Sequence, residues 1–175
     1  MKATSSVHSL AATHSRGSVA DYLELCKPRL VSLVLFTTGI GFVVGWRHDF
    51  GVRALTLLIH TIVGTALVAC GSMAMNQVME RDTDGLMRRT CTRPVPQGRV
   101  GVVEAWVFGL SLTLVGSAYL LALVNAPASG LVLFTCVVYL ALYTPLKRVT
   151  TLNTVVGAVA GAIPPMVGYA AAAGR

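Results

Sequence analysis

Long stretches without a charged residue constrain this 175-residue chain more than any other feature. A helix rises about 1.5 Å per residue, so about 20 apolar residues are needed to cross a bilayer core about 30 Å thick. The uncharged stretches cover residues 30–46, 54–79, 105–146 and 149–174. The third is long enough for two spans, and Asn125-Ala126-Pro127 can form a turn within it. The sequence therefore predicts an all-α, multi-span transmembrane helical bundle. Its five spans are expected near residues 30–46, 55–79, 103–124, 130–146 and 152–173.

Composition excludes the main alternatives to a membrane protein. Only 12% of the residues are charged and 54% are hydrophobic, whereas soluble domains carry about 25% charged residues. The net charge of +7 does not indicate nucleic-acid binding, because the basic residues lie between apolar runs rather than along one face. The four cysteines form no C-x-x-C pair, which favours scattered buried thiols over a disulfide framework or a zinc site.

The distribution of basic residues predicts the topology. Eleven of the fourteen lie in the N-terminal segment, the 80–101 loop or the pair at 147–148. The positive-inside rule therefore places the N-terminus and the 80–101 loop in the cytoplasm. Residues 1–20 have no apolar core, and we expect a disordered cytoplasmic tail there. Residues 21–175 are expected to form the N-terminal part of one membrane domain.

A polar cluster follows the second predicted span. If the helix continues, Asn76, Glu80 and Asp84 lie at successive turns on one face, while Asp82 points away. Carboxylate and amide oxygens are ligands that Mg²⁺ prefers, and ionisable residues in a membrane are functional candidates. The simpler interpretation is a helix end whose charges reach into the lipid headgroups.

Cationic residues occur at three places that the topology puts on the same membrane face. Lys27-Pro28-Arg29 opens the first span, and Tyr143 and Lys147 close the fourth. The 88–99 loop contains several arginines, among them Arg93. These cations are either anchors for acidic lipid or ligands for a diphosphate. Together with the acidic face, they predict a site for an anionic, partly apolar substrate.

The spacing Asn76-x-x-x-Glu80-x-x-x-Asp84 resembles the first aspartate-rich motif of the UbiA superfamily of intramembrane prenyltransferases, with Glu80 in place of the more usual aspartate. Three further stretches resemble one branch, the protohaem IX farnesyltransferases or haem O synthases. They are Asp21–Arg29, Met87–Pro94 and the run from Tyr143 to Tyr169, which contains Tyr143-Thr144-Pro145-Leu146-Lys147-Arg148 and Gly161-Ala162-Ile163-Pro164-Pro165.

The resemblance implies a nine-span bundle in which two acidic motifs hold Mg²⁺ and a prenyl diphosphate. It implies transfer of a farnesyl group from farnesyl diphosphate to a vinyl group of protohaem IX (haem B), giving haem O. It also implies a bacterial or mitochondrial inner membrane as the location, and a haem A-forming oxygenase as a partner. The metal and diphosphate ligands would be Asn76, Glu80 and Asp84. The substrate-binding residues would be Arg29, Arg93 and Lys147 at the leaving diphosphate and Tyr143 at the prenyl chain.

One departure from the family pattern limits what this chain is expected to do. No acidic residue follows Glu104, so the second acidic motif is missing. We therefore expect the N-terminal part of a longer protein, inactive as 175 residues alone. Two other functions remain open from the residues themselves. They are prenyl transfer to a quinone precursor or another aromatic ring, and a small transporter that binds a cation with the same acids.

Overall fold

The computed structural model describes residues 17–147 and 149–174, so most of the expected N-terminal tail lies outside the described residues. The described part is helical and contains no strand, which confirms the all-α prediction. Five helical segments are long and apolar enough to cross a membrane. They are α2 (Pro28–Gly45), α3 (Val52–Leu86), α4 (Val102–Leu123), the segment Ala126–Leu146 and α7 (Asn153–Ala173).

The fourth span is built from three consecutive helical segments. It comprises α5 (Ala126–Val137), the π-helix η1 (Val138–Tyr143) and α6 (Thr144–Leu146). It begins four residues earlier than expected because Asn125 caps it, accepting a hydrogen bond from the Ala128 N–H at 2.9 Å. The π-helix lies just before Pro145, which has no N–H to donate and whose ring crowds the preceding turn.

The second span is longer than its apolar run. Helix α3 continues without interruption to Leu86, seven residues beyond the predicted end at residue 79. The added turns carry Glu80 and Asp84, which are buried and paired with cations from other segments. Because those pairs compensate the buried charge, the helix can continue where hydropathy alone indicates its end.

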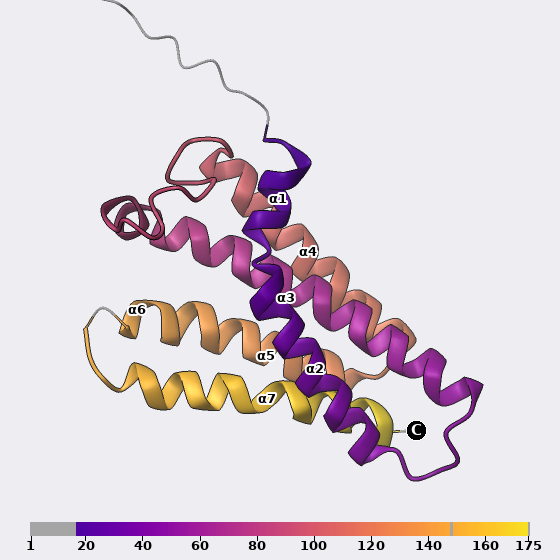
Figure 1. Ribbon diagram of the computed structural model, residues 1–175. Coiled ribbons are helices and arrows are strands. Elements are labelled where there is room, and N and C mark those ends of the chain that lie inside the picture. The colour runs from indigo at the N-terminus through magenta and orange to yellow at the C-terminus, as the bar shows by residue number, and fades with distance from the viewer. Residues whose placement is uncertain (1–16, 148, 175) are drawn as a thin grey trace, which may run out of the picture.

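A short helix precedes the first span and was not predicted. Helix α1 (Val19–Leu25) begins inside the segment expected to be a tail, capped by Ser18 and Asp21 in a reciprocal capping box. It lies at the end of the bundle where α3 ends and α4 begins (Figure 1). The Leu25 side chain is fully buried there, and the Tyr22 ring packs edge-on against Phe108 with centroids 4.9 Å apart.

Glycines allow the helices to approach closely in two pairs. Along α3 and α4, which run side by side in Figure 1, Gly71 and Gly109 face each other so closely that a methyl group on either would overlap the opposite backbone. Along α2 and α7, a methyl group on Gly168 would overlap the carbonyl oxygen of Thr38. Small residues at such crossings are typical of helix packing in membranes.

Candidate functional site at the end of α3

The three predicted ligands lie on one buried face of α3. Asn76, Glu80 and Asp84 are 1%, 4% and 2% exposed. The Asp82 side chain between them is 85% exposed and pairs with Arg81 on the surface at 3.2 Å. The alternative of a helix end reaching into headgroups therefore fits Asp82 but not the other three. Their role as metal or diphosphate ligands remains a prediction.

Asn76 is oriented by its neighbours. Its Nδ2 donates to Glu80 Oε2 at 2.9 Å, and the buried Thr144 hydroxyl lies 2.8 Å from its Oδ1. The same hydroxyl lies 2.9 Å from the Tyr139 carbonyl oxygen, so its single proton is shared between two acceptors. Thr144 therefore connects the fourth span to the acidic face, a contact that the sequence spacing did not indicate.

Each buried carboxylate is paired with a cation from another segment. Arg93, in the loop after α3, pairs with Asp84, and Lys147, at the end of α6, pairs with Glu80. The structure thus brings two of the three predicted cations to the acidic face. The third, Arg29, is an exposed residue in the first turn of α2. Its predicted role in diphosphate binding gains no support from this position.

Lys27, two residues before Arg29, faces the cluster instead. Burial, together with the charges of Arg93 and Lys147, lowers the pKa of Lys27 to about 8, although Asp84 acts to raise it. Lys27 joins α1 to α2 with a positive φ of 49°, a region that non-glycine residues rarely adopt. The Lys-Pro pair at the start of a helix was the sequence signal that could have indicated Lys27. Residue spacing alone did not show whether Lys27 or Arg29 would lie near the acidic face.

The charges around the acidic face do not cancel. Lys27, Arg93 and Lys147 are three cations, and Glu80 and Asp84 are the two buried carboxylates that they surround. A partly buried site with an excess of positive charge attracts an anion, and phosphates are common ligands of such clusters. The loop arginines Arg88 and Arg89 are exposed and lie outside this cluster, as expected for anchors to acidic lipid.

The loop that carries Arg93 is tied to the end of α3. The buried Thr90 hydroxyl donates to the Asp84 carbonyl oxygen at 3.0 Å, and the Arg93 N–H donates to the Thr90 carbonyl oxygen at 3.1 Å. Gly98 has a φ of +71°, which a residue with a side chain rarely adopts. The segment between α3 and α4 is therefore a loop held by specific contacts, and it contains no helix.

An apolar cavity of about 650 Å³ lies among α2, α3, the fourth span and α7. Ser72 and Met73, one turn before Asn76 on α3, line it, and so does Tyr143. The Tyr143 ring stacks on Tyr139 with centroids 5.4 Å apart, and it fits beside α7 because Gly157 has no side chain. The volume lies within the range of small-molecule sites.

The oxygen donors on α3 suit a hard cation. Within the described residues, no three His, Cys, Asp or Glu side chains gather as a metal site. A metal here would therefore rely on Glu80 and Asp84, with the Asn76 amide oxygen as a third donor. Carboxylate and amide oxygens match the preference of Mg²⁺, which usually takes one or two carboxylates and completes its shell with water and substrate phosphate.

Comparisons with known proteins agree on the family. The model of the UbiA prenyltransferase family matches residues 34–175. A protoheme IX farnesyltransferase of Solibacter usitatus is 46% identical over 160 residues, covering 88% of this chain and 55% of the relative. One of Nitrobacter hamburgensis is 45% identical over 161 residues, covering 91% and 50%. The chain thus spans about half the length of these curated relatives.

Solved structures agree on the fold. A UbiA homolog from Archaeoglobus fulgidus bound to GPP and Mg²⁺ superposes with a TM-score of 0.71 at 20% sequence identity, covering 87% of this chain and 54% of that one. The same homolog bound to DMAPP and Mg²⁺ gives 0.72, covering 89% and 55%. The described residues contain five helical segments long and apolar enough to cross a membrane, and this chain is an integral membrane protein that belongs to the UbiA prenyltransferase family.

Proposed function

We propose that the protein transfers a farnesyl group from farnesyl diphosphate to a vinyl group of protohaem IX, giving haem O. The observation that carries this proposal is the excess of cations around two buried carboxylates, next to an apolar cavity. A prenyl diphosphate has the matching chemistry, an anionic head on an apolar tail. The names of the relatives at about 45% identity support haem as the acceptor.

The residues of the cluster fit the departure of a diphosphate. When the allylic C–O bond breaks, its electron pair leaves with the diphosphate and an allylic cation remains. Lys27, Arg93 and Lys147 would stabilise the charge that develops on the leaving group. Mg²⁺, held by Glu80, Asp84 and the Asn76 amide, would supply further charge neutralisation at the diphosphate oxygens. The vinyl π electrons then form the new C–C bond, and water adds to the resulting haem-side cation with loss of a proton.

The cavity beside Tyr143 is the proposed place for the farnesyl chain. Its lining comes from α2, α3, the fourth span and α7 and is predominantly aliphatic and aromatic. An apolar lining excludes water from the allylic cation, which water would otherwise capture before the vinyl group attacks. The hydroxyl of Thr65, buried in this lining, has no hydrogen-bond partner among the described residues.

Topology and partners are part of the same proposal. The cluster and the 87–101 loop would face the cytoplasm, by the positive-inside rule, in a bacterial or mitochondrial inner membrane. A haem A-forming oxygenase would consume the product. Because this chain carries one acidic motif where the family pattern has two, we propose that it requires the rest of such a protein for turnover.

The test uses the longest open reading frame that contains this sequence, expressed in membranes. Labelled farnesyl diphosphate, haem B and Mg²⁺ are supplied, and haem O is measured by chromatography. Glu80→Gln and Asp84→Asn are each expected to lower the rate about 100-fold or more, and chelation of Mg²⁺ should abolish it. Asp82→Asn is the matched control, because that carboxylate is exposed.

Each alternative has a distinct outcome in this assay. Normal haem O formation by both Glu80→Gln and Asp84→Asn would refute the assigned site. Label found on a quinone precursor or another aromatic ring, with none on haem, would refute the acceptor. Cation flux into liposomes without any prenyl transfer would favour a transporter.

A further inference from the structure

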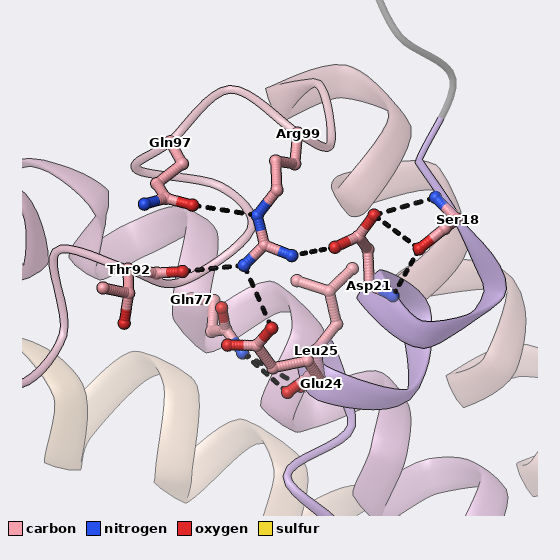
Figure 2. A network of polar contacts seen from close by, with 8 residues as sticks. All are labelled: Ser18, Asp21, Glu24, Leu25, Gln77, Thr92, Gln97 and Arg99. Carbon is pink, nitrogen blue, oxygen red and sulfur yellow. Dashed lines mark hydrogen bonds and ion pairs between the residues drawn. The ribbon is translucent and has the colours of Figure 1, made fainter.

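Arg99 links helix α1 to the loop between α3 and α4, outside the acidic face. Its guanidinium pairs with Asp21 and lies 3.0 Å from Glu24 Oε2, both on α1 (Figure 2). It also donates to the Thr92 carbonyl oxygen at 2.7 Å and to Gln97 Oε1 at 3.0 Å, both in the loop between α3 and α4. These four acceptors use the planar fork of donors that distinguishes arginine from lysine.

The α1 side of this network is firmly held. Gln77, only 1% exposed and adjacent to Asn76, donates from Nε2 to the carbonyl oxygens of Glu24 and Leu25 at 3.2 and 3.3 Å. The pKa of Asp21 is lowered, first because the Ser18 N–H and hydroxyl donate to its carboxylate and also because Arg99 lies beside it. Helix α1 is therefore fixed to α3 next to the candidate ligands.

The loop side of the network leads directly to the acidic face. The Thr92 carbonyl that accepts from Arg99 immediately precedes Arg93, whose guanidinium pairs with buried Asp84. Thr90 fixes the start of this loop segment to the end of α3. Arg99 fixes its continuation to α1, so the backbone around Arg93 is held from both sides.

We propose that Arg99 is a positioning residue that holds Arg93 in place for the bound diphosphate by tying its loop to α1. This inference rests on the proposed diphosphate site, but not on the identity of the acceptor. Without Arg99 the loop would sample conformations in which Arg93 is withdrawn, and the apparent affinity for the anion would fall with the fraction of competent molecules.

The experiment measures binding and loop opening in the same full-length protein. Dissociation constants for farnesyl diphosphate with Mg²⁺ are determined by calorimetry, and loop opening by hydrogen–deuterium exchange of the 88–98 peptides. Arg99→Gln is expected to raise the dissociation constant about tenfold, in the lower range for loss of a supporting contact, and to accelerate exchange in this loop. Arg88→Gln is the control, with the same charge change at an exposed position of the same loop.

Two further variants separate positioning from general destabilisation. In an Arg93→Gln background, Arg99→Gln should change the dissociation constant less than about twofold, because the residue through which it acts is gone. Arg99→Lys, which keeps the charge but cannot reach all four acceptors, should give an intermediate affinity and remains informative if the glutamine variant does not fold.

The outcomes distinguish this inference from the proposed function. Unchanged affinity or unchanged exchange in the Arg99 variants would overturn the positioning role even if haem O is formed. The positioning role would also be overturned if the increases in the dissociation constant caused by Arg99→Gln and by Arg93→Gln multiply in the double variant. A protein that binds the diphosphate and shows the expected Arg99 pattern, yet transfers no farnesyl group to haem, would refute only the acceptor. Absence of any diphosphate binding by the wild type would overturn both.

Discussion

Thr144 offers a sharp test of how the acidic face is organised. Its buried hydroxyl lies 2.8 Å from Asn76 Oδ1, and Asn76 in turn donates to Glu80. Thr144→Val keeps the shape of the side chain and removes this donor. The buried Asn76 oxygen then lacks its partner, which costs about 1–3 kcal/mol. The freed amide can rotate away from the geometry that a metal would use.

The matched variant is Thr144→Ser, which keeps the hydroxyl and removes one methyl group. Loss of a buried methyl costs about 0.8 kcal/mol, so both variants should melt at lower temperature than the wild type. Their Mg²⁺ dependence should differ. In Thr144→Val we expect the Mg²⁺ concentration for half-maximal haem O synthesis to rise about 10- to 100-fold, the usual range when a residue that supports a metal ligand is lost. In Thr144→Ser we expect this concentration to stay near the wild-type value.

The assay is a magnesium titration of haem O synthesis, with thermal unfolding of the same preparations in detergent. A valine variant that melts lower but needs no more Mg²⁺ than the serine variant would refute the role of Thr144 in orienting Asn76. Equal increases in both variants would also refute it, because only one of them lacks the hydroxyl.

Three other changes test separate parts of the structure. Lys27→Gly should not lower thermal stability, because glycine adopts a φ of 49° without the penalty of about 1–2 kcal/mol, yet it should raise KM for the prenyl diphosphate; an unchanged KM would contradict the place of Lys27 in the cluster. Gly168→Ala should cost about 1–3 kcal/mol of unfolding free energy through overpacking against Thr38, whereas Gly161→Ala, with open space around it, should melt like the wild type. The lowered pKa of Asp21 means that its ionised form stabilises the fold above the ordinary aspartate pKa of about 3.9. The melting temperature of the wild type should therefore exceed that of Asp21→Asn at neutral pH, and the difference should vanish as the pH falls through the lowered pKa; a difference that persists in acid would contradict this.

Much of the fold could be predicted because the thickness of a bilayer fixes how many apolar residues one helical span needs. The lengths of the apolar runs therefore indicate the number of spanning helices. The uncharged runs indicated five spans, and the described residues contain five helical segments long and apolar enough to cross a membrane. The ends of the helices were harder to predict, because they depend on local contacts that a hydropathy pattern does not show. Asn125 lies in the connection between α4 and α5, as expected, but it also caps α5, so the fourth span begins at Ala126 rather than at residue 130. Helix α1 is only seven residues long and is held by capping and side-chain contacts, so its composition did not indicate a helix.

The acidic face of the site could be predicted, but its partners could not. Helical periodicity places Asn76, Glu80 and Asp84 on one side of any continuous helix, and α3 is continuous. The cations come from distant segments, and their reach depends on turns such as the positive φ at Lys27. Neither local spacing nor hydropathy relates Arg99 to Asp21, which lies 78 residues earlier in the chain.

The two buried ion pairs have a consequence for the order in which ligands enter. Glu80 is already neutralised by Lys147 and Asp84 by Arg93, so a bare divalent ion meets no unbalanced negative field and must compete with tethered ammonium and guanidinium groups. An incoming pyrophosphate ester changes this balance, because its oxygens can take over those groups and leave the carboxylates available. We therefore expect magnesium to arrive already complexed with the ester, and its apparent affinity to remain low until that ester is present.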